Sequence, residues 1–323
     1  MSRKGTMRAL VYDGSMAVAD VPVPSPRTGE ALVRVLMAGI CKTDVEIGKG
    51  YMSFQGIPGH EFVGIVEDSP RAEQMGARVV GEINAGCADC SFCAAGLERH
   101  CPNRTVLGIA GRNGAFAEYL TLPASNLIPV PEGLSNEKAV FTEPLAAALE
   151  ICEQVHIEPR HRVLVIGDGK LGLLVCFALR LTGCNLVLVG KHQEKMRMFE
   201  RMGGVTVTLD HLDEISEPFD IVVEASGNPS GFECAMKHIR PRGILVLKST
   251  YHGTLTLDAA PIVINEISII GSRCGIFGPA LRLMNEGLVD PSPLVDEVFP
   301  FERAEQAFRK SQEPGVFKVL MEF

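Results

Sequence analysis

One stretch in the middle of the chain decides the fold: Arg162-Val163-Leu164-Val165-Ile166-Gly167-Asp168-Gly169-Lys170-Leu171-Gly172. After the leading arginine its first residues are all apolar, which predicts a buried strand, and its last six match the glycine pattern GxGxxG. An amphipathic segment then runs to Leu181, ends at Gly183 and leads into a second apolar run at 186–189. A glycine turn between a buried strand and a helix is typical of a dinucleotide-binding site.

Each part of this turn has an expected task. Gly167 permits the tight turn, Gly169 lets the backbone approach a pyrophosphate, and Gly172 lets the helix pack closely on the strand. The helix that begins at Lys170 and Leu171 would present its unpaired N–H groups to the phosphates. A purely structural turn without a ligand is the alternative interpretation.

The end of the second strand predicts which nicotinamide cofactor binds. NAD-binding domains place an Asp or Glu there, and it accepts a hydrogen bond from the adenosine ribose 2′-OH. Here the strand ends in Gly190-Lys191-His192, so the carboxylate is missing and two potential cations follow. Because Lys191 can pair with a 2′-phosphate, we expect NADP rather than NAD. Alternatively, Lys191 is only solvated and either cofactor binds.

Asp168 is an unusual residue for such a turn. We expect its side chain to point away from the cofactor phosphates, because a carboxylate that faced them would be repelled.

Four short apolar runs alternate with helix-length segments between Pro144 and about Gly271. This alternation predicts a buried parallel sheet built from βαβ units, and therefore an α/β fold. Ser226 lies two residues after the run at 221–224. Because ligands bind at the carboxyl ends of such strands, we expect it to contact the nicotinamide half of the cofactor. Residues 1–145 are instead rich in short strands, and the last fifty residues are mixed in character.

Composition excludes several classes of function. The 323 residues correspond to about two domains at roughly 150 residues each. Lys and Arg number 31 against 39 Asp and Glu, a net charge of −8 that argues against nucleic-acid binding. The N-terminus lacks an apolar leader, and the longest apolar stretch, near 171–179, is far shorter than the roughly 18 residues of a membrane span. We therefore expect a cytoplasmic protein whose ten cysteines are reduced.

Four of these cysteines form a compact array. Cys87, Cys90, Cys93 and Cys101 follow the spacing CxxCxxCx(7)C in a loop. Four thiolates spaced in this way can close a tetrahedron around Zn²⁺, which predicts a structural zinc site. An iron–sulfur cluster is a weaker alternative, because the ferredoxin pattern has three residues before its last cysteine. The remaining alternative is that the four thiols only pack in the core.

A second set of candidate metal ligands is scattered along the chain. Cys41 lies in Gly39-Ile40-Cys41-Lys42-Thr43-Asp44, and His60 and Glu61 lie in Gly59-His60-Glu61. A thiolate, an imidazole and a carboxylate are the mixture that a catalytic zinc with an exchangeable position uses. Glu143, in Thr142-Glu143-Pro144, adds a carboxylate near the expected boundary between domains.

Taken together and in order, these motifs resemble the zinc-dependent medium-chain dehydrogenase/reductase family, and most of all its sorbitol, threonine and glucose dehydrogenase branch. The resemblance covers essentially the whole chain. It implies a GroES-like catalytic domain made of residues 1–145 and 272–323, with a Rossmann domain, 146–271, inserted between them. It also implies a dimer or tetramer.

The resemblance assigns roles to individual residues. Cys41, His60 and Glu143 match the ligands of the catalytic zinc, and Glu61 matches a glutamate that binds the zinc directly or through water. Thr43 matches the hydroxyl residue that relays the substrate proton, and Asp44 matches the acid that orients the zinc-bound imidazole.

Two positions match residues beside the cofactor in the family. Lys42 matches a frequently basic position near the pyrophosphate, and Arg273 matches a residue that lines the cleft beside the cofactor. One departure is Glu46, which stands where many relatives have the histidine of an outer proton path.

The function implied is hydride transfer between a secondary alcohol or polyol, or its carbonyl, and a nicotinamide cofactor, with two zinc ions per chain. Two rivals stay open. One is an alkene or quinone reductase of the same fold that makes no chemical use of zinc. The other is a zinc-stabilised NADP-binding protein without dehydrogenase activity.

Overall fold

The structure is a computed structural model that describes residues 5–250 and 254–323. The chain divides into two compact units, one made of Met1–Glu143 with Ala280–Phe323 and the other of Pro144–Pro279. Two helices cross from one unit into the other along the chain, α4 (Thr142–Gln154) and α9 (Phe277–Asn285).

The first unit is mainly β-structure. Its strands and helices are β1 (Thr6–Tyr12), β2 (Met16–Pro22), β3 (Glu30–Gly39), α1 (Lys42–Ile47), β4 (Glu61–Asp68), β5 (Arg78–Gly81), β6 (Asn84–Ala85), α2 (Ser91–Ala94), β7 (Thr105–Leu107), β8 (Gly111–Arg112), β9 (Tyr119–Pro123), β10 (Leu127–Pro129), α3 (Asn136–Ala139), β17 (Val295–Pro300), α10 (Ala304–Lys310) and β18 (Lys318–Glu322).

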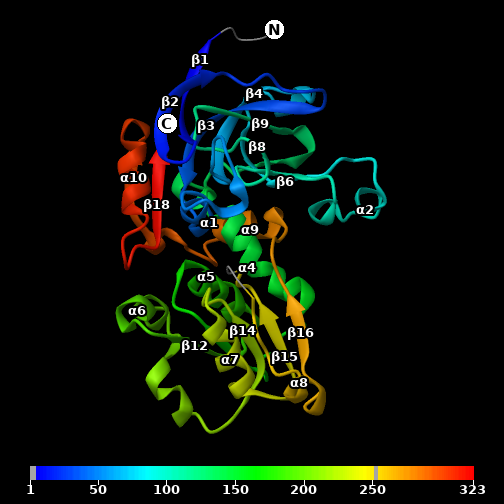
Figure 1. Cartoon of the computed structure of the whole chain (residues 1–323), viewed down its shortest axis with the longest axis vertical. Helices are drawn as coiled ribbons and strands as arrows, with labels where there is room; N and C mark the ends of the chain where they lie inside the picture. Colours follow the sequence, from blue (N-terminus) through cyan, green and yellow to red (C-terminus); the bar gives the residue numbers. More distant parts are fainter. Residues whose placement is uncertain (1–4, 251–253) are drawn as a thin grey trace. The chain divides into compact units, whose positions relative to one another are not determined.

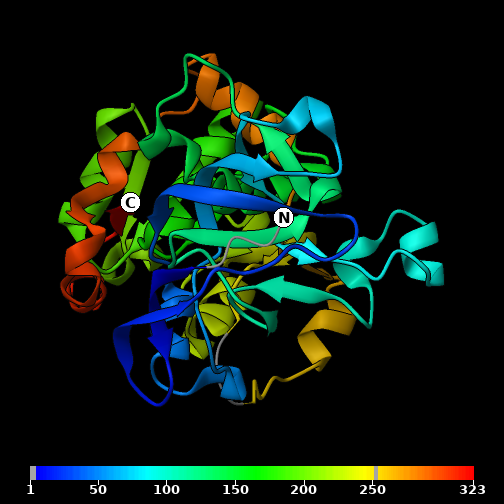
Figure 2. The same cartoon turned by 90° about the horizontal axis from the view of Figure 1, so that it is seen from above.

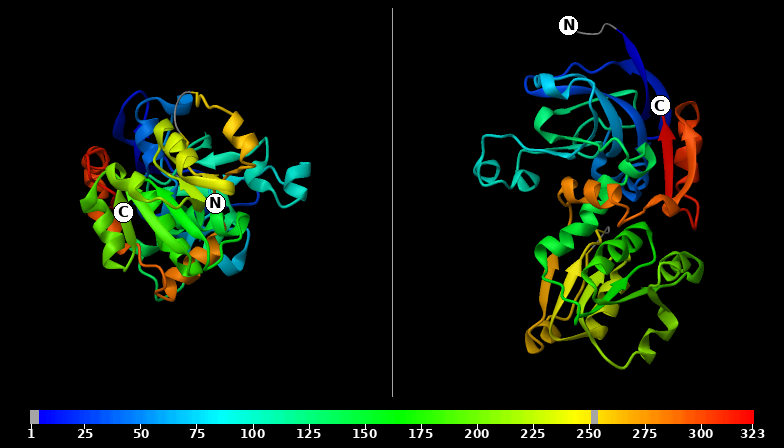
Figure 3. Two further views of the ribbon diagram at one scale, coloured as in Figure 1. Left: turned by 90° about the horizontal axis from the view of Figure 1, so that it is seen from below. Right: turned by 180° about the vertical axis from the view of Figure 1, so that it is seen from behind.

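The main sheet of this unit joins the two ends of the chain. Its seven strands run in the order β10-β5-β4-β3-β18-β17, with β9 paired to β3. The C-terminal β18 pairs antiparallel with β3, so that Met321 lies opposite Ala38. Val319 and Met321 pack in one apolar cluster with Val33 and Val35 of β3. Helix α10 lies alongside β18 (Figure 3, right).

The loop with the four cysteines stands apart from these sheets. It carries α2 and projects as a separate lobe (Figures 1 and 2). Its base is formed by the small sheet β6-β7-β8.

The second unit contains the predicted parallel sheet. Its elements are β11 (Arg162–Ile166), α5 (Lys170–Leu179), β12 (Asn185–Gly190), α6 (Gln193–Arg201), β13 (Val205–Thr208), β14 (Phe219–Glu224), α7 (Pro229–His238), β15 (Ile239–Leu247), α8 (Ala260–Ile264) and β16 (Ser268–Gly271). All neighbouring strands are parallel, in the order β13-β12-β11-β14-β15-β16. This is the strand order of a Rossmann fold, which confirms the expected α/β fold class.

The strand register brings the candidate cofactor residues to one edge of this sheet. Ile166 at the end of β11 lies opposite Val189 of β12 and Glu224 of β14. Gly167, which follows β11, therefore lies next to the end of β12, whose last residue is Gly190. The strands are apolar because both faces of the sheet are covered, and the last four residues of β11 are fully buried.

Among the described residues, no helix has both the length and the apolar composition needed to cross a membrane.

Candidate active site

The glycine turn has the geometry that the sequence predicts. Gly167 adopts a φ of +123°, and α5 begins at Lys170 with Gly169 as its N-cap. A Cβ on Gly172 would lie 1.9 Å from the carbonyl oxygen of Gly167, so turn and helix approach more closely than any side chain permits. No side chain in the described part of the chain caps α5. The N-terminus of α5 therefore has the form of a phosphate-binding turn, and contacts to Lys170 and Leu171 stay predicted.

Asp168 is turned toward the end of β12. Its Oδ2 accepts hydrogen bonds from the backbone N–H groups of Lys191 (2.8 Å) and His192 (2.7 Å), and it lies 3.0 Å from Nδ1 of His192. The side chain also packs directly on Gly190. The sequence does not reveal this contact, although the acid in the turn and the glycine at the strand end are both visible in it.

Ser226 and Arg273 both form hydrogen bonds with residues of the second unit. The Ser226 hydroxyl donates to Oε1 of Glu224 at 2.6 Å, and the Ser226 N–H bonds the same oxygen at 2.7 Å. The carbonyl of Arg273 accepts a hydrogen bond of 3.0 Å from Nζ of Lys248. Lys248 is buried and also donates to the carbonyl of Ala147 at 2.6 Å. The sequence interpretation missed Lys248, whose only signal is a lysine at the end of an apolar strand.

In the first unit, Cys41, His60 and Glu61 come together. Each offers one ligand atom, and these atoms lie within 4.8 Å of one another. Cys41 is the N-cap residue of α1, and Glu61 begins β4 opposite Gly39 of β3. His60 and Glu61 are buried, whereas Cys41 is partly exposed. A thiolate, an imidazole and a carboxylate at this spacing suit a zinc ion with an open position.

Asp44 ties the two ligand-bearing loops together. The carboxylate is fully buried; its Oδ2 accepts a hydrogen bond from the Cys41 N–H (2.8 Å), and its Oδ1 accepts one from the Gly59 N–H (3.1 Å). The same Oδ1 lies 3.2 Å from Nδ1 of His60. Asp44 therefore lies against the Nδ1 side of the imidazole, where it can keep the ring in place, as carboxylates do beside metal-bound histidines.

The electrostatics of His60 suit a cation beside its ring. Burial lowers the pKa of His60, but the charge of Asp44 and hydrogen bonds to Asp44 and Cys41 outweigh it, so that the pKa lies well above its ordinary value. Asp44 and Cys41 therefore both favour a positive charge on the His60 ring or next to it. A divalent cation would take the place of that proton.

Thr43, Lys42 and Glu46 surround this cluster. The Thr43 hydroxyl oxygen lies 4.0 Å from the Cys41 sulfur. Lys42 and Lys49 each lie 3.1 Å from Oε1 of Glu46. Burial raises the pKa of Glu46, but hydrogen bonds from both lysines outweigh it, and the pKa lies below its ordinary value. Glu46 therefore stays ionised near neutral pH and cannot replace a histidine as a proton carrier there.

Glu143 lies near the cluster without joining it. Among the described residues, the group of mutually close ligand atoms contains Cys41, His60 and Glu61 only. Burial raises the pKa of Glu143 to about 7; the charge of His60 opposes this shift, and that of Glu61 adds to it. Its role as a ligand stays a prediction.

Glu61 has a buried partner from the far end of the chain. Nζ of Lys318 makes an ion pair with Oε2 of Glu61, and both side chains are fully buried. The same ammonium group lies 5.4 Å from the centre of the Phe141 ring. The sequence interpretation missed Lys318, whose one signal is a charged residue at the head of the apolar run 319–321.

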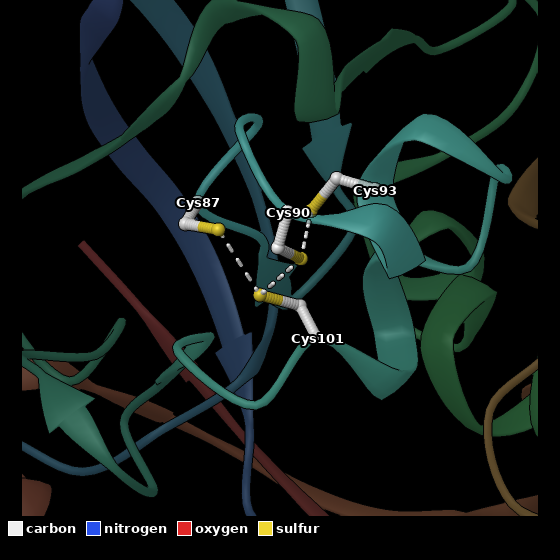
Figure 4. Close-up of side chains that lie close together, drawn as sticks. All are labelled: Cys87, Cys90, Cys93 and Cys101. Carbon is white, nitrogen blue, oxygen red and sulfur yellow. Dashed lines mark hydrogen bonds between the residues drawn. The ribbon is translucent and has the colours of Figure 1, made fainter.

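The four cysteines of the lobe also converge (Figure 4). Sulfur–sulfur distances are 3.5 Å from Cys101 to Cys87, 3.7 Å from Cys101 to Cys90 and 3.6 Å from Cys90 to Cys93. A tetrahedron with Zn–S bonds of about 2.3 Å has edges of about 3.8 Å. Burial raises the pKa of Cys93 to about 12, and the neighbouring thiols add to the shift, so that a cation is needed to hold the Cys93 sulfur as a thiolate.

All ten cysteines are free of disulfides. Of the five outside the two clusters, Cys176 is buried, but Cys152 is exposed.

Comparison with known proteins decides the family. The model of the alcohol dehydrogenase GroES-like domain matches residues 27–132, and that of the glucose dehydrogenase C-terminus matches residues 136–323. D-arabinitol dehydrogenase 1 of Uromyces fabae is 30% identical, over 98% of this chain and 97% of its own. The chain belongs to the zinc-dependent medium-chain dehydrogenase/reductase family. It is an oxidoreductase that acts on CH–OH donors.

Two further relatives of this dehydrogenase have the same extent. L-threonine 3-dehydrogenase of Chromobacterium violaceum is 28% identical over 95% of this chain and 96% of its own. A crystal structure from Sinorhizobium meliloti 1021, described as a zinc-binding dehydrogenase bound to NADP, superimposes with a TM-score of 0.90 at 26% identity. It covers 99% of this chain and 100% of that chain.

The buried pair predicts how this dehydrogenase responds to loss of Lys318. In metal-free protein, Lys318→Met should lower the free energy of unfolding by about 3–5 kcal/mol, because the Glu61 carboxylate stays buried without its cation. Urea unfolding followed by circular dichroism measures the change.

The matched control is Lys310→Met, which removes an exposed lysine 2.6 Å from Glu313 and should leave stability unchanged. Adding Glu61→Gln to Lys318→Met should recover most of the loss. Equal stability of Lys318→Met and wild type would show that the pair contributes nothing.

Proposed function

We propose that this dehydrogenase transfers hydride between a secondary alcohol or polyol, or the corresponding carbonyl compound, and a nicotinamide cofactor, with zinc held by Cys41, His60 and Glu61. The observation that carries the proposal is the buried Asp44, which fixes the Cys41 and His60 loops to one another. A structural role alone does not require a thiol, an imidazole and a carboxylate to converge at one buried point. We propose Glu143 as a further ligand, recruited from its place beside the cluster.

When bound, zinc supplies Lewis acidity to the substrate oxygen and the nicotinamide supplies the hydride acceptor. The residues of the chain then position and move the proton. Thr43 accepts the proton of the alcohol, since its hydroxyl lies beside the Cys41 sulfur. Asp44 would keep the His60 ring in place as a ligand for the metal. Lys318 pairs with one carboxylate oxygen of Glu61 and so restricts the movement of the Glu61 side chain.

The proposed substrate class rests on the relatives. Those named above act on D-arabinitol, a polyol, and on the 3-hydroxyl group of L-threonine, a secondary alcohol. Both share the CH–OH group that this chemistry oxidises.

The cofactor is proposed to lie on the glycine turn, with its pyrophosphate at the N-terminus of α5. Gly167, Gly169 and Gly172 leave the room for it, and Lys42, Ser226 and Arg273 stay predicted contacts. The predicted preference for NADP rests on Lys191 and on the missing acid at Gly190, and the relative from S. meliloti binds NADP. The carboxylate of Asp168 at the same strand end acts against that preference.

The second zinc is proposed to be structural. Cys87, Cys90, Cys93 and Cys101 fill a tetrahedron and leave no position for a substrate. This gives two zinc ions per chain. The cytoplasmic location expected from the sequence stays a proposal.

Metal content and turnover measured together test the function. We expect two zinc ions per chain and NAD(P) reduction with secondary alcohols or polyols. Cys41→Ser should hold one zinc and lose at least about 100-fold in kcat, because a lost ligand removes the Lewis acid. Cys93→Ser should also lose one zinc, but should be affected mainly in stability.

Cys152→Ser, which changes an exposed cysteine outside both clusters, is the matched control and should keep both metals and full activity. Full activity in Cys41→Ser would refute the catalytic assignment. One zinc in wild type and no turnover with a broad panel of alcohols would favour a zinc-stabilised NADP-binding protein without dehydrogenase activity instead.

We also propose that the chain forms a homo-oligomer through the edge of its parallel sheet. Strand β16 is the last strand of the sheet. Around it Val263, Ile264, Ile269 and Ile276 expose 75%, 77%, 38% and 50% of their surface. An open strand edge flanked by apolar side chains fits a second copy of the same surface.

Light scattering during size exclusion tests this surface. Wild type should have at least twice the chain mass of 34.9 kDa. Val263→Ser with Ile264→Ser should shift the mass toward that of one chain, because it removes apolar surface from the contact. Leu288→Ser, at another exposed apolar residue, should not. A monomeric wild type at all concentrations would rule the contact out.

A further inference from the structure

Three hydrogen-bond donors converge on a single oxygen at the end of β12. They are the N–H groups of Lys191 and His192 and the Nδ1 of His192, and all three bond Oδ2 of Asp168. Two successive N–H groups and an imidazole form a ready site for an anion. The anion in it is a carboxylate of the chain itself, contributed by the glycine turn.

Asp168 also explains why the strand ends in glycine. A Cβ on Gly190 would lie 2.4 Å from the Cβ and 2.6 Å from the Oδ2 of Asp168. A side chain at residue 190 and the observed position of Asp168 therefore exclude each other. The strand itself has no acid at its end, but the carboxylate of Asp168 from the glycine turn lies in that position.

The free side of this carboxylate suits a ribose hydroxyl. In the described part of the chain every hydrogen bond to Asp168 uses Oδ2, which leaves Oδ1 as an acceptor. The side chain keeps 13% of its surface exposed, so a ligand can reach it. In NAD-binding domains the carboxylate at the end of this strand accepts the hydrogen bond of the ribose 2′-OH.

A 2′-phosphate, in contrast, would be disfavoured at this position. It would face the negative charge of Asp168, and the two N–H groups that could bind it are already taken by Oδ2. The exposed side chain of Lys191 would favour a 2′-phosphate, but an exposed lysine pairs weakly, whereas three hydrogen bonds hold the Asp168 carboxylate in place.

We propose that Asp168 is a specificity-determining residue that selects NAD over NADP by placing a carboxylate from the glycine turn at the end of β12. This inference rests on the proposed function, because it assumes that a nicotinamide dinucleotide binds this turn. It reverses the preference for NADP that Gly190 and Lys191 predict from the sequence alone.

Binding of NADH and NADPH, followed by nicotinamide fluorescence and separate from turnover, tests the proposal. Wild type should bind NADH at least about tenfold tighter than NADPH. Asp168→Asn keeps the side-chain shape and removes the charge, and it should move the ratio of the two Kd values about tenfold toward NADPH. Asp168→Ser should move it in the same direction.

A double variant tests whether a carboxylate at the end of β12 is sufficient, whichever residue supplies it. Asp168→Ala with Gly190→Asp removes the acid from the turn and places one at the strand end, so it should restore the preference for NADH. Glu233→Gln, which removes an exposed negative charge on α7, is the control for net charge and should leave the ratio unchanged. Thermal unfolding of each variant shows that it is folded.

The outcomes are distinct. A wild type that binds NADPH more tightly, or a ratio that does not move in Asp168→Asn, overturns this inference and leaves the proposed function intact. Failure to bind either cofactor overturns the proposed function itself.

Discussion

The candidate metal centre depends on one buried carboxylate. Asp44 accepts hydrogen bonds from the backbone on both sides of the cluster, at Cys41 and at Gly59, and it contacts the ring of His60. A fully buried carboxylate is costly unless several donors satisfy it. The donors belong to the Cys41 loop and to the loop before His60, and these two loops must meet if Cys41 and His60 are to share a metal. The same contacts therefore stabilise the fold and set the positions of the ligands. The third ligand candidate, Glu61, is fixed separately by Lys318 of the C-terminal strand.

In the second unit, close approach of the backbone positions the glycine turn. Gly172 lets α5 begin against the carbonyl of Gly167, and the apolar strand β11 fixes where that turn stands. The parallel strand order then brings Gly190 beside it, and Asp168 bridges the two. The turn and the strand end therefore act as one recognition element, and neither can be changed without affecting the other.

Features that depend on neighbouring residues could be predicted from the sequence. The glycine turn follows a buried strand and opens a helix, and the four cysteines lie in one loop, so local geometry alone brings each set together. The family resemblance joined Cys41 to His60 and Glu61. Contacts across long sequence separations could not be predicted: Glu61 and Lys318 are 257 residues apart, and they meet only because β18 returns to the first sheet. Asp168 reaches Lys191 through strand register, which a glycine motif does not reveal.

The central claim is that metal at Cys41, His60 and Glu61 is needed for hydride transfer and not for holding the cofactor. Brief treatment with a chelator that strips only the accessible metal, followed by zinc analysis, NADH binding and turnover on one sample, tests it most directly. We expect loss of one zinc per chain and of turnover, an unchanged Kd for NADH, and recovery of turnover when zinc is returned. Full turnover by protein that keeps only the four-cysteine zinc would contradict it.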